Sequence, residues 1–371
     1  MFMNYMDYCW DEVTIMFTTA QVARMHATLL GPRASVLGSN FCEFILQTGT
    51  ALHEVDSTFE FLMTDWNSDG SQDLVAIKKR NTGTNSTEIH VLSGATRFQT
   101  FLLQTGTGLH ETDDPLHILS GATRSQNSLL QTGTGLHETE DTLRALSGAT
   151  SFQIPLLQTG TELHETDDSF QFLLTQDRDV VAIKKRGTGT NSTEVHRLSR
   201  ASQFRAFNLQ TGTALHETDG TFQFLMVDWN RDGADDLVAI KKSGTGTKST
   251  EVHILSGASN FERYLLRTGT PLPETGQSTK FLLTDWKGDG RADLVAVRNS
   301  GTSAEKTSIH ILSGATRFQT FLLQTDTALH KTDGTFDFAM ADWDRTGPPD
   351  LVAIKKTGTG TNSTEVHVLA G

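Results

Sequence analysis

One segment recurs along this chain, and the recurrence constrains the fold more than any other feature. Asp-Trp pairs begin at Asp228, Asp285 and Asp342, 57 residues apart, and the pair at Asp65 has similar surroundings. A period of this length is typical of proteins built from stacked supersecondary units. The sequence therefore predicts a repeat architecture and not a single continuous core.

Each repeat holds four short apolar runs, separated by Gly, Thr, Asn and Asp. None is long enough, or periodic enough at 3.6 residues, to predict a helix. In one repeat we expect strands A to D over 221–227, 237–241, 250–255 and 261–266. Turn-forming residues such as Asp232-Gly233 and Ser256-Gly257 lie between them. The unit is a four-stranded meander.

A sheet of this size cannot bury both faces alone, so neighbouring copies have to stack. Radial stacking into a β-propeller leaves only short, protected strand edges. The predicted fold class is therefore all-β, a six-bladed β-propeller of four-stranded blades, with seven blades as the alternative.

The two ends of the chain predict how the ring closes. The last repeat ends after a strand C at 364–369, whereas 39–50 reads as a strand D without its own A, B and C. We expect this N-terminal strand to complete the last blade, so that 39–371 forms a single propeller domain.

The second blade is irregular. The Leu-Gln-Thr-Gly-Thr phrase starts at Leu103, Leu130 and Leu157, at intervals of only 27 residues. The stretch 117–161 reads as two C–D hairpins in tandem. Since two hairpins supply four strands, we expect a blade whose A–B half was replaced by a duplicated C–D half.

Residues 1–38 are rich in Met and aromatic side chains and do not belong to the repeats. No basic region followed by an apolar region marks a secretory signal, and no apolar run approaches membrane-spanning length. We expect this segment to plug the central channel, with an oligomer contact as the alternative. The expected location is cytoplasmic, or secreted without a signal peptide; in a secreted chain the Asn-Ser-Thr sequons at Asn85, Asn191 and Asn362 would be glycosylated.

Composition narrows the partners. A net charge of −13 and a pI near 5.4 disfavour nucleic acid and anionic membranes. The polar groups capable of chemistry occur in several equivalent copies, whereas catalysis usually needs one asymmetric constellation. We therefore expect no enzyme but a multivalent binding protein, such as a lectin, in which weak pockets acting together raise avidity by roughly 10² to 10⁴.

Histidine gathers at two positions of the repeat, strand C and the linker after strand D. Repetition alone could reflect duplication of the unit, and that interpretation stays open. The strand C histidines are His90, His117, His196, His253, His310 and His367, and the linker histidines are His53, His110, His137, His164, His216 and His330.

The Asp-Trp turn predicts a metal site. Asp65, Asn67, Asp69 and Asp73 place oxygen side chains at positions 1, 3, 5 and 9, with Gly at position 6, a spacing that suits Ca²⁺. The set recurs in full in Asp228, Asn230, Asp232 and Asp236, whereas Lys287 and Thr346 interrupt it in later repeats. We expect two structural calcium sites; the alternative is that these side chains only cap the turn.

Three phrases carry a resemblance to a known family. Thr-Glu-Val-His-x-Leu-Ser-Gly-Ala, Leu-Gln-Thr-Gly-Thr-Ala-Leu-His-Glu-Thr and Asp-Trp-Asn-x-Asp-Gly-x-x-Asp-Leu-Val-Ala-Ile resemble the mushroom β-propeller lectins of the Psathyrella velutina and Agrocybe aegerita type over roughly 36–371. The Asp-Trp turn alone also occurs in integrin-type FG-GAP repeats. The resemblance implies binding of terminal N-acetylglucosamine, with sialic acid as an additional candidate, between consecutive blades. It also implies Ca²⁺ in the A–B loops and an N-terminal segment in the central cavity.

In that family an aromatic ring and a histidine pack against the sugar. The matching candidates are strand C histidines, strand D aromatics and the His-Glu pairs of the linker, although the aromatics could equally be interblade core. The Trp residues of the turns are expected to be core. The candidate sugar-binding residues are His90, Phe98, Phe101, His196, Phe204, His253, Phe261, Tyr264, His310, Phe318, His367, His53, Glu54, His110, Glu111, His164, Glu165, His216, Glu217 and His330.

The copies are unequal, so we expect four to six working pockets. Arg144 stands where the irregular blade would have a strand C histidine, and Pro273 replaces a linker histidine. The alternative function is a calcium-stabilised, integrin-like adhesion scaffold that binds a protein; whether the ring forms oligomers stays open.

Overall fold

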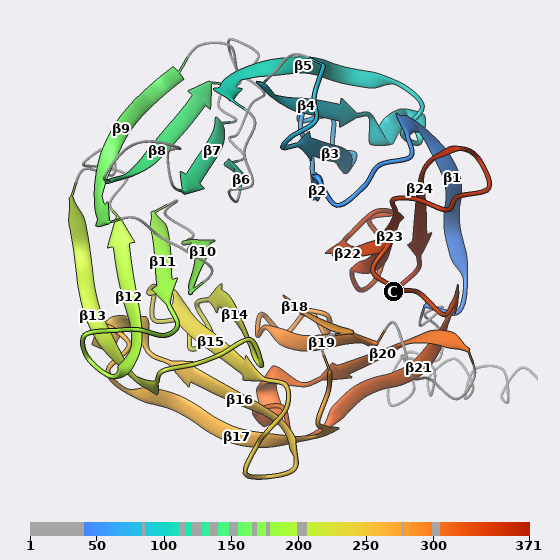
Figure 1. The fold of residues 1–371 in the computed structure, drawn as a ribbon. Helices are drawn as coiled ribbons and strands as arrows, with labels where there is room; N and C mark the ends of the chain where they lie inside the picture. The colour runs from blue at the N-terminus through green and yellow to red at the C-terminus, as the bar shows by residue number, and fades with distance from the viewer. Residues whose placement is uncertain are drawn as a thin grey trace, which may run out of the picture.

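Twenty-four strands pair into six four-stranded antiparallel sheets that are arranged as the blades of a propeller (Figure 1). The structure is a computed structural model and describes residues 41–83, 86–110, 116–119, 128–133, 140–147, 155–164, 169–175, 179–198, 206–276, 278–298 and 305–371. The all-β propeller is confirmed, and the described strands form six sheets, not seven. The predicted plug over 1–38 lies outside the described residues.

We number the blades in chain order, and within each blade the strands run from A at the centre to D at the rim. Blade 1 consists of β2 (Phe59–Thr64), β3 (Asp73–Lys78), β4 (Ser86–Leu92) and β5 (Phe101–His110). Blade 2 consists of β6 (Leu116–Leu119), β7 (Ser128–Gly133), β8 (Glu140–Ser147) and β9 (Pro155–His164). Blade 3 consists of β10 (Phe170–Leu174), β11 (Val180–Lys184), β12 (Ser192–Leu198) and β13 (Phe207–His216).

The other three blades follow the same order. Blade 4 consists of β14 (Phe222–Val227), β15 (Asp236–Lys241), β16 (Ser249–Leu255) and β17 (Tyr264–Pro273). Blade 5 consists of β18 (Thr279–Thr284), β19 (Asp293–Arg298), β20 (Lys306–Leu312) and β21 (Phe321–His330). Blade 6 consists of β22 (Phe336–Ala341), β23 (Asp350–Lys355), β24 (Ser363–Leu369) and β1 (Phe44–His53).

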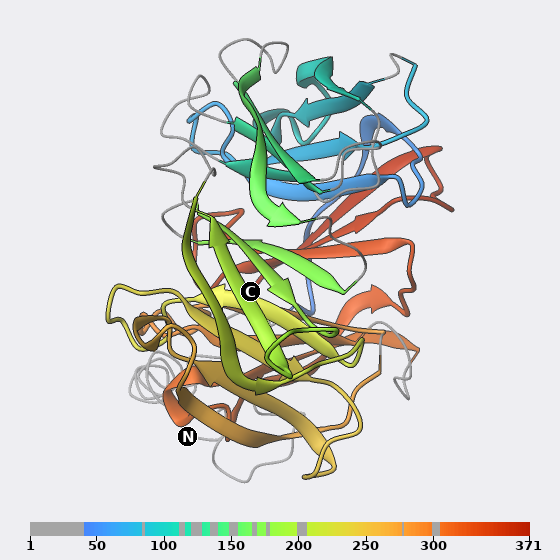
Figure 2. The same cartoon turned by 60° about the vertical axis from the view of Figure 1, so that its left-hand side comes forward.

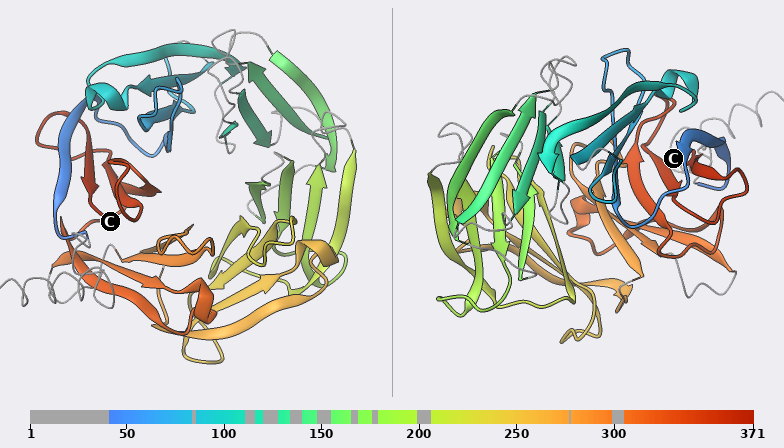
Figure 3. Two further views of the ribbon diagram at one scale, coloured as in Figure 1. Left: turned by 180° about the vertical axis from the view of Figure 1, so that it is seen from behind. Right: turned by 45° about the horizontal axis from the view of Figure 1, so that its top comes forward.

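The ring closes as the two chain ends predict. The order of the last sheet is β1-β24-β23-β22, so that β1 supplies strand D of blade 6. Seen from behind, β1 runs along the rim beside the strands of the C-terminal end (Figure 3). The expected closure is therefore confirmed.

Blade 2 has the four strands predicted from two tandem hairpins, in the order β6-β7-β8-β9. Its outer pair keeps the usual C–D register, because Arg144 lies opposite Gln158 as His90 lies opposite Gln104. The inner hairpin does not keep it: β6 occupies the strand A position, and His117 pairs with Leu130. His117 is thus not a strand C residue, since the duplicated hairpin had to fill the A and B positions.

Strand D differs from the prediction. In blade 4 it runs from Tyr264 to Pro273, so the Thr-Gly-Thr phrase and the first two residues of the expected linker lie inside the strand. Before it, Gly257–Ser259 forms a 3-10 helix, and Asn260 and Phe261 adopt left-handed φ values of 54° and 63°. The apolar Phe261 suggested an early strand start, but its backbone belongs to a tight turn.

Consecutive blades pack face to face around the ring (Figure 2). In blades 1, 3, 4, 5 and 6 one face presents β-branched side chains of strands B and C, such as Val238 and Ile254 in blade 4. The facing surface of the next blade contributes a strand A phenylalanine and an alanine of strand B, Phe281 and Ala296. This apolar contact holds the blades together, because four strands bury little alone. Within the part of the chain described above, no helix is long and apolar enough to cross a membrane.

Candidate functional site

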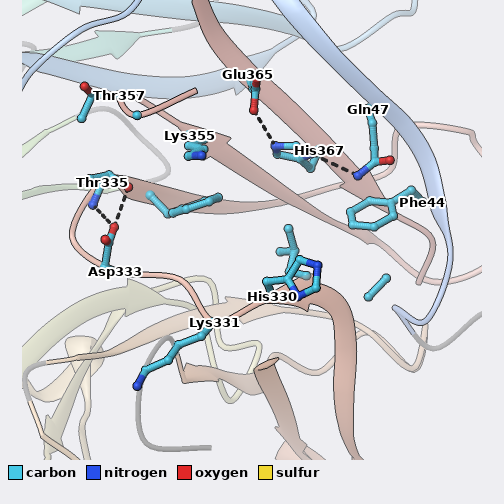
Figure 4. A pocket seen from close by; sticks show the side chains of 14 residues that line it. Phe44, Gln47, His330, Lys331, Asp333, Thr335, Lys355, Thr357, Glu365 and His367 are labelled. Atoms are coloured by element: carbon cyan, nitrogen blue, oxygen red, sulfur yellow. Dashed lines mark hydrogen bonds and ion pairs between the residues drawn. The ribbon is translucent and has the colours of Figure 1, made fainter. Parts of the chain in front are cut away.

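A cavity of about 570 Å³ lies between blades 5 and 6 (Figure 4). One wall is the face of blade 6 that is turned to blade 5, and the other is the end of β21 with the linker that follows it. The cavity is lined by Phe44, Gln47, Ala328, Leu329, His330, Lys331, Asp333, Thr335, Phe336, Lys355, Thr357, Gly358, Glu365 and His367. It therefore brings together a strand C histidine and a His of the end of strand D, the two groups that the sequence singled out.

His367 lies at the centre of the blade 6 wall. Its Nε2 is 3.5 Å from Oε2 of Glu365, and its Nδ1 is 3.5 Å from Nε2 of Gln47. Burial lowers the pKa of His367, although the carboxylate of Glu365 opposes this shift. The imidazole is thus held neutral, and an amide donor beside Nδ1 places the ring proton on Nε2, which faces the carboxylate.

Two aromatic rings flank this polar centre. The ring of Phe44 lies 6.0 Å from that of His367, and the ring of Phe336 lies 6.5 Å from it. Nζ of Lys355 sits 5.9 Å from the centre of the Phe336 ring. The wall therefore combines apolar ring faces with an amine, a carboxylate, an imidazole and an amide.

The pairing of the strands explains this grouping. Phe336, Lys355 and Glu365 lie opposite one another on strands A, B and C, and His367 lies opposite Gln47 on strands C and D. Residues at alternate positions of a strand share one face, so all of these side chains point to the same side of the sheet. We call the six positions, in the order Phe336, Lys355, Glu365, His367, Gln47 and Phe44, the pocket set.

The pocket set recurs in three other blades. Its members are Phe59, Lys78, Glu88, His90, Gln104 and Phe101 in blade 1, and Phe170, Lys184, Glu194, His196, Gln210 and Phe207 in blade 3. In blade 4 they are Phe222, Lys241, Glu251, His253, Arg267 and Tyr264. The His Nε2 to Glu Oε2 distances are 3.5, 3.4 and 3.4 Å in these blades, and the centres of the His and strand D rings are 6.1, 5.8 and 6.1 Å apart.

Two of these histidines carry an unused acceptor. His90 and His253 are 6% and 8% exposed, and within the described residues their buried Nδ1 atoms have no hydrogen-bond partner. A buried polar atom without a partner costs about 1–3 kcal/mol. In blade 6 the equivalent nitrogen meets the amide of Gln47.

Blade 5 departs from the pocket set at three positions and at one position beside it. Thr279 replaces the strand A phenylalanine, and Arg298 replaces the lysine. Ser308 replaces the glutamate, while Asp326 stands opposite it where the other described strand pairs have glycine. The core positions Phe281 and Ala296 are retained. The changes are thus confined to side chains that would meet a ligand.

Three predicted sugar contacts are wrong in position. Phe98, Phe261 and Phe318 are only 0%, 3% and 0% exposed and lie in the interblade core. The backbone O of Phe98 also accepts a hydrogen bond from the N–H of Ala51 in the preceding blade. Their left-handed turn directs these rings into the blade interface, so they offer no face to a sugar.

The linker residues divide into two groups. His53, His216 and His330 end strand D and are exposed, and His330 lines the cavity. Glu54 and Glu217 instead accept hydrogen bonds from Thr359 and Thr188, in the B–C hairpin of the blade whose strand D each glutamate follows, and these bonds lower the pKa values of both carboxyls. They tie the start of the linker to the blade that it leaves. His110 and His164 end their strands in the same way, while their side chains, and Phe204, Glu111 and Glu165, lie outside the described residues.

The sequence interpretation missed the strand A phenylalanines and the strand B lysines of the pocket set. A signal was present, because Phe-x-Phe opens strand A and Lys closes strand B in repeat after repeat. The interpretation also missed the amides Gln47, Gln104 and Gln210, which lie in the Leu-Gln-Thr-Gly-Thr phrase that served above to measure the repeat intervals. Tyr264, the tyrosine of the repeats, donates its hydroxyl to the carbonyl of Ala214 at 2.8 Å, so its ring and not its OH faces the cavity position.

The Asp-rich turns are closed by their own side chains. In blade 4, Asp228 accepts hydrogen bonds from the backbone N–H groups of Asp232 and Gly233, and Asn230 also accepts one from Asp232. Blade 1 repeats this pattern with Asp65, Asn67, Asp69 and Gly70. These bonds agree with a capped turn, and hard oxygen donors gathered in one loop also suit Ca²⁺.

The position 9 carboxylates have a further role. Asp236 accepts the N–H groups of both Trp229 and Gly257, at 3.1 and 2.9 Å, and Asp73 bonds Trp66 and Gly94 in the same way. Burial raises the pKa of Asp236 to about 6. Both carboxylate oxygens are therefore committed to tying the A–B turn to the turn before strand D, which makes this residue a structural support of any ion site.

Blade 6 shows the closest grouping of carboxylates among the described residues. Ligand oxygens of Asp342, Asp344 and Asp350 lie within 4.8 Å of one another. This is a turn that the sequence marked as weakened by Thr346. The backbone N–H of Asp344 points to Oδ2 of Asp350 at 3.4 Å, which draws the two acidic residues together.

Comparisons with known proteins identify no family for this chain, because no family model and no curated protein matches it. Among solved structures, BBS1N in complex with ARL6DN has a TM-score of 0.43 at 9% identity, covering 89% of this chain and 97% of its own. An exo-β-1,3-galactanase from Clostridium thermocellum has a TM-score of 0.37 at 9% identity, covering 86% and 78%.

Proposed function

We propose that this protein is a multivalent lectin that binds terminal N-acetylglucosamine in cavities between consecutive blades. The observation that carries the proposal is the blade 6 wall, where Phe44 and Phe336 flank Lys355, Glu365 and His367 around one cavity. A pyranose has apolar C–H faces, which pack on aromatic rings, and equatorial hydroxyls, which need donors and acceptors at the ring edge. The pocket set offers both.

The repetition of the set supports binding over catalysis. Blades 1, 3 and 6 carry the full set in their described residues, and blade 4 carries it with Arg267 and Tyr264 at the two strand D positions. Blade 5 has lost the aromatic platform and the glutamate, so we propose that its cavity does not hold the same sugar. Four weak sites on one rigid ring engage a surface of glycans together, and avidity replaces affinity. Sialic acid is a second candidate ligand, because its acetamido group resembles that of N-acetylglucosamine.

Calcium enters the proposal as a stabiliser of the A–B turns of blades 1 and 4. The ion would be held by Asp65 and Asp69 in blade 1 and by Asp228 and Asp232 in blade 4. Asp73 and Asp236 would support these turns through their bonds to the backbone N–H groups of the turn. The ion would supply charge neutralisation of the clustered carboxylates and no contact to the sugar, because these turns belong to the A–B connections and not to the pocket set.

Isothermal titration with N-acetylglucosamine tests the proposal. We expect saturable binding at four sites per chain and a rise in melting temperature, since a ligand that binds only the folded state stabilises it. Phe101→Ala in blade 1 should reduce the number of sites by one, and the matched Phe321→Ala in blade 5 should leave it unchanged. An adhesion scaffold predicts neither heat nor thermal stabilisation with the free sugar, and one site per chain would remove the repeated-pocket part.

A further inference from the structure

The cavity between blades 5 and 6 differs from its counterparts in the origin of its walls. In the other described sheets, strands C and D are consecutive along the chain, as in β16 and β17. In blade 6 the pairing of β24 with β1 joins segments from the two ends of the described chain, and Gln47 and His367 are 320 positions apart. This pairing is the seam at which the ring closes.

The seam is held by backbone pairing and by contacts at both ends of β1. The N–H of Phe41 donates to the carbonyl of Ala370 at 2.8 Å, and the N–H of Ala370 donates to the carbonyl of Glu43 at 3.1 Å. At the other end, Oγ1 of Thr364 donates to the carbonyl of His53 at 3.0 Å. No short turn connects the two strands, so the separation of β1 from β24 opens the ring without breaking a covalent link.

The cavity spans this seam. Phe44 and Gln47 come from β1, whereas Phe336, Lys355, Glu365 and His367 come from the opposite side. Figure 4 shows Gln47 and His367 facing each other across the boundary between the two strands. Their side chains meet only at 3.5 Å, the long limit of a hydrogen bond. This polar side-chain contact is therefore weak without a ligand. The apolar packing of Leu46 against Val366 and Val368 also holds the seam, and a molecule in the cavity touches both sides of it.

We propose that the ligand of this cavity locks the ring closed, so that sugar binding at blade 6 controls the opening of the seam. The proposal rests on the function given above. A ligand that needs both walls binds only the closed ring, and it lowers the population of the open ring by the factor 1 + [L]/Kd. At a sugar concentration ten times Kd, opening becomes about 11-fold rarer. The sites of blades 3 and 4 include no part of β1 and have no such effect.

Hydrogen exchange of the full chain with N-acetylglucosamine tests the lock. In the wild type we expect the backbone amides of β1 to exchange about tenfold more slowly at ten times Kd. Phe336→Ala combined with Lys355→Ala removes the blade 6 site from the wall opposite β1 and should abolish this protection. The matched pair Phe222→Ala and Lys241→Ala in blade 4 should remove one site and keep the protection of β1. If either double variant does not fold, the single variants Lys355→Ala in blade 6 and Lys241→Ala in blade 4 are compared instead.

The outcomes separate the two proposals. Calorimetry that shows no binding of N-acetylglucosamine overturns both the function and the lock. Binding with unchanged exchange of β1, or protection of β1 that survives the blade 6 variant, overturns the lock and leaves the lectin function standing. Protection that is lost with the blade 6 variant and kept with the blade 4 variant supports it.

Discussion

Oδ1 of Asp293 accepts a hydrogen bond from the backbone N–H of Gly314 at 2.8 Å, and this bond ties the A–B turn of blade 5 to the turn before its strand D. The other oxygen accepts the N–H of Lys287 at 3.2 Å. Asp293 is 0% exposed, and burial raises the pKa of its carboxyl. The same link recurs through Asp73, Asp236 and Asp350. This pair of hydrogen bonds is therefore a repeated contact that fixes the positions of the two turns in each of these blades.

Replacing this carboxylate should destabilise the protein. Asp293→Ala leaves two backbone N–H groups of a closed turn without their acceptor, and each unsatisfied donor costs about 1–3 kcal/mol. We expect the free energy of unfolding to fall by about 2–4 kcal/mol in urea titrations. Glu262→Ala, at an exposed position of blade 4, is the control and should have little effect. A loss as small as that of the control would show that the link is dispensable.

Position 314 has no room for a side chain, so only glycine fits there. A Cβ at this position would lie 2.2 Å from the carbonyl O of Ala292, a backbone atom that cannot move away alone. We expect Gly314→Ala to disrupt the link to Asp293 and to lower the melting temperature by several degrees. Gly334→Ala meets nothing within 4 Å and serves as the matched control. Equal melting temperatures of the two variants would contradict this account.

The fold could be predicted well from the sequence because the same strand pattern recurs in the repeats. Where the pattern of one repeat is ambiguous, the other repeats show where its strands lie. The sequence placed His367 and His330 as candidates, and the structure brings both to one cavity. The prediction that Phe98 contacts the sugar failed. An aromatic residue directly after a tight turn has the sequence pattern of the first residue of a strand. The sequence interpretation also missed Lys355 and Phe336, because the alignment of strands A, B and C follows from register, which a period alone does not reveal.

Acidification should weaken the fold through the strand C histidines. Burial lowers the pKa values of His90, His196, His253, His310 and His367 below the ordinary value of 6.5. At these five histidines the unfolded chain therefore binds more protons than the folded chain below pH 6.5. Their contribution to stability is full above that pH and falls as the pH drops through the folded-state values, by at most about 1.4 kcal/mol per pH unit for each histidine. Asp236, whose pKa is raised to about 6 in the folded state, opposes this loss.

Denaturant titrations between pH 7 and pH 5 measure this slope. The variant His253→Gln removes one titrating group, so its stability should decline less steeply than that of the wild type. A variant slope equal to the wild-type slope would mean that His253 does not contribute to the acid sensitivity.

Calcium should raise the melting temperature if the turns of blades 1 and 4 bind it. At 100 times Kd a single site adds about 2.7 kcal/mol. The double variant Asp65→Asn and Asp228→Asn should lose the calcium-dependent shift, and Asp285→Asn, in the turn interrupted by Lys287, should keep it. A shift that survives the double variant and disappears with Asp344→Ala would assign the ion to the carboxylate group of blade 6.

Blade 5 offers a gain-of-binding test. Its Ser308 and Asp326 face each other where other blades pair glutamate with glycine, so its carboxylate stands on the neighbouring strand. The variant with Thr279→Phe, Arg298→Lys, Ser308→Glu and Asp326→Gly restores the pocket set at these positions. Because Phe281, Leu294 and Ala296 of the core are already retained, we expect the variant to fold.

Calorimetry should then count one more N-acetylglucosamine site per chain than in the wild type. The converse change Glu251→Ser in blade 4 should remove one site, because it takes away the carboxylate that holds the proton-bearing Nε2 of His253 at 3.4 Å. A folded blade 5 variant with an unchanged number of sites would contradict the pocket set as the sole determinant of binding, and would point to Pro273 at the end of β17 in blade 4, which faces the restored cavity in place of the exposed histidine.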